Sequence, residues 1–117
     1  MRMEGLRDRT KEFALRVVRL FVALPKSSES QVLGKQLLRS GTSVAANFRE
    51  ASRARSEAEF VAKLGIVEQE IDESMLWLEL LAEAGILKQE LLTPLHDEAE
   101  ELLKIIVTSV RRTKEKM

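Results

Sequence analysis

The sequence predicts an all-α protein, an antiparallel up-down-up-down bundle of four helices in which residues 1–117 form a single domain. Hydrophobic residues make up 44% and charged residues 32% of the chain, with few aromatic residues and two prolines, a composition typical of helical proteins. Apolar residues recur at helical spacing in four segments joined by short links. A chain of 117 residues has room for one hydrophobic core and not for two.

The first helix is expected from about Asp8 to Leu24, where Pro25 ends it. Helical spacing predicts a core stripe of Leu6, Phe13, Val17, Leu20 and Leu24. Further apolar residues lie beside this stripe, so the apolar arc covers well over the third of the circumference that a bundle helix buries. We expect that one chain does not cover the arc and that the protein associates with itself. The additional residues are Ala14, Leu15, Val18, Phe21 and Val22.

The second helix is expected from Ser28 to about Ser52, because Ser28 and Gln31 match a capping box. Gly34 and Gly41 fall inside it, and each costs up to about 1 kcal/mol relative to alanine in a helix interior. Such glycines indicate either a bend or the close approach of a neighbouring helix. We expect close packing.

The third and longest helix is expected between a second capping box, formed by Ser56 and Glu59, and Gly85 in the C′ position. Its predicted core stripe is Phe60, Leu64, Val67, Ile71, Met75, Leu78 and Ala82. A file of mixed polar and apolar residues runs beside that stripe and consists of Lys63, Ile66, Glu70, Glu73, Trp77 and Leu81.

The last helix is expected to begin at Thr93 and Pro94, which form a favourable N-cap and N1 pair. Acidic residues in its first turns and basic residues in its last turns suit the helix dipole. Its predicted core stripe is Leu95, Ala99, Leu102, Ile106 and Val110.

A row of polar side chains runs along the second helix beside the apolar row. The row is Arg39, Ser43, Asn47 and Glu50. One interpretation is a solvated face. The other is a polar network with Lys63, Glu70 and Glu73, which would fix helix register or a subunit contact, or line a ligand groove. We predict a structural role for at least Arg39 and Asn47.

No set of residues indicates catalysis, a metal site or a cofactor. The chain has no cysteine, which excludes disulfides and thiolate chemistry. His96 is the only histidine and Thr93 stands three residues before it, so the Glu-x-x-His ligand motif of di-metal bundles is absent. Ser40 and Ser43 have no base at a recognised spacing and are better interpreted as helix-packing serines. The sequence therefore predicts a protein that is not an enzyme.

The sequence also contains no membrane signal. No apolar run approaches the roughly 20 residues that a membrane span requires, and the N-terminal residues lack the apolar core of a signal peptide. We expect a soluble, cytoplasmic protein without membrane contact.

Charges are unevenly distributed although 19 basic and 19 acidic residues cancel. Residues 1–55 are basic, whereas residues 56–92 hold nine acidic and two basic groups. The simpler interpretation is that these segments pack together and complement each other. The sharper one is a basic surface for an anionic partner. The candidate nucleic-acid contacts are Arg7, Arg9, Arg49, Arg53, Arg55, Arg111, Arg112, Lys114 and Lys116.

Four stretches, residues 36–51 (QLLRSGTSVAANFREA), 56–63, 70–81 and 98–110, resemble the four-helix bundle family of 23S ribosomal RNA intervening-sequence proteins. The resemblance implies an antiparallel bundle that assembles into a ring, typically a homopentamer, and a function that is unestablished for the family. Some relatives are encoded within insertions in large ribosomal RNA genes, and a related branch serves diversity-generating retroelements as a nucleic-acid-binding accessory protein. RNA or DNA is therefore the implied partner.

Two functional hypotheses remain. The first is a non-enzymatic oligomeric scaffold that binds nucleic acid or a ribonucleoprotein. The second is a protein-interaction module whose polar groove holds a partner segment or a small ligand.

Overall fold

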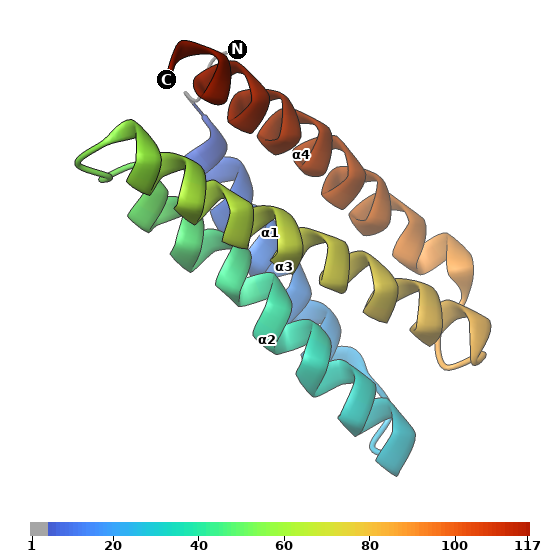
Figure 1. Cartoon of the computed structure of the whole chain (residues 1–117). Helices are drawn as coiled ribbons and strands as arrows, with labels where there is room; N and C mark the ends of the chain where they lie inside the picture. Colours follow the sequence, from blue (N-terminus) through green and yellow to red (C-terminus); the bar gives the residue numbers. More distant parts are fainter. Residues whose placement is uncertain (1–4) are drawn as a thin grey trace.

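The computed structural model describes residues 5–117 and consists of four α-helices. They are α1 (Leu6–Ala23), α2 (Ser28–Ala51), α3 (Glu57–Glu83) and α4 (Gln89–Lys116) (Figure 1). The all-α class is confirmed, since the described residues contain no strand. Residues 1–4 of the predicted domain lie outside the described residues. The described bundle is elongated, with extents of 48 × 20 × 19 Å.

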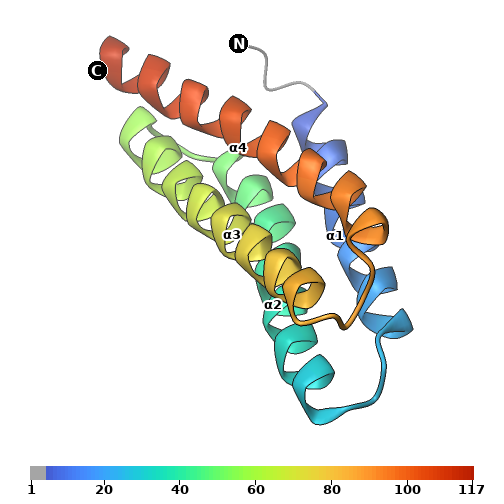
Figure 2. The same cartoon turned by 90° about the vertical axis from the view of Figure 1, so that its right-hand side faces the viewer.

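The helices pack around a ring of neighbours in which α2 contacts α1 and α3, and α4 contacts α3 and α1. The contact between α1 and α4 is the smallest of the four. Helices α1 and α3 are not adjacent and lie diagonally across the bundle, as the two views show (Figures 1 and 2). The starts of α1 and α3 and the ends of α2 and α4 gather at one end of the molecule (Figure 1).

The two glycines of α2 allow α1 to approach closely. A Cβ atom at Gly41 would lie 2.7 Å from the Cγ2 atom of Val17, and one at Gly34 would overlap the side chain of Leu24. A side chain at Gly41 would push against Val17 and move α1 away, and one at Gly34 would displace the side chains of Leu24 and Phe21. The predicted close packing is confirmed.

The ends of α3 also match their prediction. Ser56 is the N-cap, and its hydroxyl accepts a hydrogen bond of 3.1 Å from the backbone N–H of Glu59. Gly85 has φ of +73° and follows the C-cap. Its N–H donates to the carbonyl of Ala82, and the N–H of Ile86 donates to that of Leu81, which is the Schellman arrangement.

Helix α2 starts at Ser28 as predicted, but its predicted capping box is wrong. The N-cap of α2 is Ser27, not Ser28, and the Ser27 hydroxyl donates to the Ser30 hydroxyl over 2.7 Å. Gln31 does not complete a capping box, because its side-chain amide donates to the carbonyl of Pro25. The bond to Pro25 fastens the link between α1 and α2 to the start of α2.

Helix α4 begins at Gln89, four residues before the predicted N-cap Thr93. Pro94 lies inside the helix, where it lacks the N–H that would bind the carbonyl of residue 90. The Thr93 hydroxyl does not cap the helix but donates to the carbonyl of Gln89 over 2.9 Å. The earlier start places Leu92 in the core with only 3% of its surface exposed, and burial of a leucine outweighs one missing hydrogen bond.

One hydrophobic core runs along the bundle and draws on all four helices. Most predicted stripe residues are buried in it, although five of them are only partly buried: Leu20, Phe60, Met75, Ala82 and Val110. Leu81, predicted in the mixed file, is fully buried. None of the helices within residues 5–117 combines the length and the apolar character needed to cross a membrane.

Candidate nucleic-acid interface

An open hollow of about 740 Å³, here called the basic basin, lies where α1 begins, α2 ends and α3 begins. Ala45 and Ala46 form part of its lining, and their short side chains leave space over the outer face of α2. Charged side chains from three helices and the α2–α3 link surround that space. The complete lining is Arg7, Lys11, Ala45, Ala46, Arg49, Glu50, Arg53, Arg55, Glu59 and Lys63.

The basin is strongly positive although the chain is neutral. Its lining holds six basic and two acidic side chains. Glu50 is bound to the Nζ atom of Lys63 over 2.6 Å, so this carboxylate and this ammonium neutralise each other. Within residues 5–117, no ion pair engages the guanidinium group of Arg49, Arg53 or Arg55. The basin therefore presents cations that an external anion can pair with.

Four of the nine predicted nucleic-acid contacts line the basin: Arg7, Arg49, Arg53 and Arg55. Lys11 was not among the predicted contacts, and Lys63 was predicted only in the polar network. Lys11 follows Arg7 by four residues on the same helix, so helical spacing could have identified it.

Arg9 was grouped with these contacts but has another position. Its Nε and Nη2 atoms donate to the two carboxylate oxygens of Glu98 over 3.1 and 2.9 Å, which joins α1 to α4. The hydrogen bond to Glu98 raises the pKa of Arg9 above its usual value. An arginine held by a bidentate bond is less available to a ligand, so Arg9 serves the bundle.

The basic residues at the end of α4 form a separate surface. Arg111 and Lys114 line a hollow of about 420 Å³ with Glu68 and Glu115, so its charges are mixed. Arg112 and Lys116 are exposed on the same helix end. The structure therefore does not bring these four tail cations into the basic basin.

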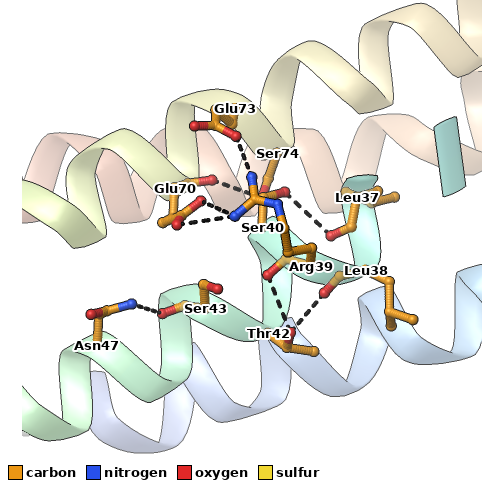
Figure 3. A network of polar contacts seen from close by, with 10 residues as sticks. All are labelled: Leu37, Leu38, Arg39, Ser40, Thr42, Ser43, Asn47, Glu70, Glu73 and Ser74. Carbon is orange, nitrogen blue, oxygen red and sulfur yellow. Dashed lines mark hydrogen bonds and ion pairs between the residues drawn. The ribbon is translucent and has the colours of Figure 1, made fainter. Parts of the chain in front are cut away.

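The polar row of α2 divides into three separate parts rather than forming one network, and two of them are drawn in Figure 3. In the first, Arg39 donates to both carboxylate oxygens of Glu70 at 3.3 Å and to Glu73 at 2.5 Å. These are the partners expected from the sequence. The bond to Glu70 is the main cause that raises the pKa of Arg39. The Arg39 side chain is 49% exposed, so the cluster lies at the surface of the α2–α3 seam.

The remaining polar residues of the row are not part of the Arg39 cluster. The side-chain amide of Asn47 donates to the backbone carbonyl of Ser43 over 2.9 Å, within α2 itself (Figure 3). Glu50 pairs with Lys63 in the basin, as described. The row thus divides into a cluster in the middle of the seam, a local bond at Asn47, and an ion pair at the basin.

A buried pair of hydroxyl groups lies directly beneath the Arg39 cluster. The Oγ atoms of Ser40 and Ser74 are 2.8 Å apart, and both residues are fully buried. Ser74 also donates to the carbonyl of Glu70 over 2.8 Å and Ser40 to that of Leu37 over 3.3 Å, and either hydroxyl can be the donor in the bond between them. Ser40 is a helix-packing serine, as expected, and its hydroxyl is committed to the contact between α2 and α3.

The single histidine lies between α3 and α4, at the opposite end from the basin. His96 Nε2 is 2.8 Å from a carboxylate oxygen of Glu79, beside a hollow of about 410 Å³. Among the residues that the structure describes, no group of three or more histidine or acidic side chains is arranged to hold a metal ion. The chemistry that this geometry supports best is electrostatic binding of an anion at the basin.

Comparison with known proteins identifies a family and similar solved structures. The family model described as 23S rRNA-intervening sequence protein matches residues 6–108, which include the whole basin but not the tail cations. A crystal structure of a protein of unknown function from the S23 ribosomal protein family of Bacteroides thetaiotaomicron is 38% identical, with a TM-score of 0.83. The match covers 89% of this chain and 96% of that one. No curated protein matches the chain.

Proposed function

Because the chain belongs to the 23S rRNA-intervening sequence protein family, we propose that it is a non-enzymatic, oligomeric scaffold that binds nucleic acid through the basic basin. In this proposal the antiparallel bundle assembles into a ring, a homopentamer as the family resemblance implies, and acts in the cytoplasm. The observation that carries the proposal is the gathering of six basic side chains from separate elements around one hollow with two acidic ones.

The side chains of the basin suit phosphate groups. Arginine presents a planar fork of donors that matches a phosphate, and four arginines line the hollow. No aromatic side chain belongs to the lining, so the basin lacks the stacking surfaces that hold single-stranded bases. Contacts to phosphate fix position without reading the sequence. We therefore expect backbone recognition with slight sequence preference.

The zero net charge of the chain does not oppose such binding, because charge acts locally in salt. The screening length is about 10 Å at 0.1 M ionic strength. At 1.5 Å per residue, Glu79 and Glu83 lie roughly 24 to 30 Å along α3 from Lys63 at the basin. Their repulsion of a ligand in the basin is thus largely screened.

Assembly would strengthen weak contacts. A ring repeats the basin in every subunit, so one nucleic-acid chain can engage several basins at once, and avidity exceeds the affinity of one site. The exposed apolar residues of α1 that the bundle leaves uncovered, Leu15, Val18 and Val22, support self-association.

The test is a salt titration of RNA and DNA binding, followed by fluorescence anisotropy. The logarithm of the binding constant should fall against the logarithm of salt concentration, with a slope of about −0.9 per phosphate on duplex DNA and about −0.7 on single strands. The double variant Arg53→Glu/Arg55→Glu should weaken binding and flatten that slope. Removal of the tail after Val110 should have a smaller effect.

A matched control is available at the opposite end of the bundle. Lys26→Glu/Lys35→Glu makes the same change in net charge at two exposed positions outside the basin. Binding should stay near that of the unaltered chain. Equal losses of affinity in both double variants would show that binding depends on net charge and not on the basin. Absence of binding at low salt would favour the protein-interaction module instead.

A further inference from the structure

Two helices carry exposed apolar residues in line. On α1, Leu15, Val18 and Val22 follow the i, i+3, i+7 spacing of one helix face, and Val22 is 68% exposed. On α3, the exposed residues are Ile66, Leu76 and Leu80. Leu76 and Leu80 follow Ile66 by ten and fourteen residues, which is close to three and four helical turns. Scattered exposed leucines are ordinary, but a row along one face is a surface that can be covered. These rows are called the α1 stripe and the α3 stripe.

The two stripes lie on opposite sides of the bundle at similar heights. Helices α1 and α3 are diagonal to each other in the bundle (Figures 1 and 2). The side chains of both stripes are exposed to solvent. Both helices begin at the basin end (Figure 1). At 1.5 Å per residue, the α1 stripe spans about 14 to 24 Å from the start of its helix and the α3 stripe about 14 to 35 Å, so the two stripes overlap along the axis over the length of the α1 stripe. Two bundles placed side by side would bring the stripes together.

We infer that the α1 stripe of one chain packs against the α3 stripe of a second copy. This inference rests on the self-association in the proposed function. Charge selects the pairing. Outside the ion pairs of the described structure, α1 retains three basic residues, Arg7, Lys11 and Arg16, and one acidic residue, whereas α3 after Lys63 retains three acidic residues, Glu68, Asp72 and Glu83, and no basic one. A contact between two copies of the same stripe would oppose like charges, and the mixed contact brings opposite charges together.

The contact joins two different surfaces, so it is heterologous. An open row of subunits then has a free α1 stripe at one end and a free α3 stripe at the other, and growth continues until a ring closes. Gly65 supports the use of this side of α3. A Cβ atom added there would meet no atom within 4 Å, so packing inside the chain gives no reason for a glycine in mid-helix.

Two blocking variants test the pairing. Val18→Glu/Val22→Glu blocks the α1 stripe, and Leu76→Glu/Leu80→Glu blocks the α3 stripe. Both change exposed residues, so each chain should keep its helical circular dichroism. Light scattering coupled to size exclusion should show several chains per particle for the unaltered protein and single chains of 13.3 kDa for each variant alone.

The decisive measurement is an equimolar mixture of the two variants. One usable α1 stripe and one usable α3 stripe remain in the mixture, so it should form particles of two chains and none larger. A dimer of either variant alone would show that a stripe pairs with its own kind and would overturn the inference, as would a mixture that stays monomeric. A monomeric unaltered protein would instead refute the proposed assembly itself.

Discussion

The first two thirds of α2 and its last third use the same residue types for different purposes. Up to Val44, the helix is committed to the bundle: Gly34 and Gly41 receive α1, Ser40 bonds to α3, and Arg39 is paired with two carboxylates. From Ala45 onward, its outer face carries Arg49, which has no ion pair in the described structure, and alanines that leave room beside it. An arginine next to acidic residues ties helices together, whereas one among other cations is available to a ligand.

The largest loss of stability should come from the committed region. Gly41→Ala forces a methyl group against Val17, whose branched side chain has little freedom to move, and should lower the free energy of unfolding by about 1 to 3 kcal/mol. In the background of the blocking variant Val18→Glu/Val22→Glu, Gly65→Ala is the control, because its methyl group meets open space within the chain and alanine should stabilise the helix by up to about 1 kcal/mol. Urea unfolding measures both. A neutral Gly41→Ala would show that the α1–α2 contact yields easily.

A smaller effect is expected at Arg39. Arg39→Ala leaves Glu70, whose side chain is 14% exposed, without its cation, but Arg39 itself is half exposed. Surface ion pairs contribute about 0 to 1 kcal/mol, so we expect a loss within that range and an unchanged oligomer. Thermal melting checks the stability, and nucleic-acid binding should be unaffected. Weaker binding with an unchanged melting temperature would assign Arg39 to a ligand groove instead.

The opposite pattern is expected at Arg49. Arg49→Ala removes an exposed cation of the basin, so stability should change by no more than about 0.5 kcal/mol. Binding should weaken, and the salt slope should fall by about 0.7 to 0.9 if one phosphate contact is lost. Anisotropy titrations at several salt concentrations measure this. A loss of stability like that of Arg39→Ala would remove the distinction between the two regions.

The smallest change is expected at Glu50, on the border between them. Glu50→Gln removes a negative charge from the basin and releases Lys63 from its ion pair. Because both side chains are partly exposed, stability should change by less than about 1 kcal/mol. Affinity for nucleic acid should rise, most clearly at low salt, where charges are least screened. An unchanged affinity would place the ligand away from this side of the basin.

Local sequence patterns predicted most of the fold because helix periodicity and caps are local properties. Ser56 with Glu59 and Gly85 identified both ends of α3 correctly. The start of α4 was wrong because Thr93 and Pro94 satisfy the local rules for a helix start, whereas burial of Leu92 depends on the other helices. Local preference for a helix start is overridden where tertiary packing contributes more free energy.

The candidate site was predictable only in part for the same reason. The partners of Arg39 could be named because α2 and α3 are adjacent in the chain and face each other. The sequence offered no such guide for Arg9, whose partner Glu98 is 89 residues away. The basin needs the first turn of α1 beside the last turns of α2, so its arginines could be listed from the sequence but not brought together.

The bond between Arg9 and Glu98 also bears on how the bundle folds. The other side-chain bonds between helices join residues that are 13 to 34 positions apart in the described structure, whereas this bond closes a loop of 89. Closing a longer loop costs more chain entropy, and local contacts form sooner. We expect the three successive helix pairs to form first and the α1–α4 seam to close last. In the native protein that seam should open first, so amide hydrogens near it should exchange with solvent earliest among the buried ones.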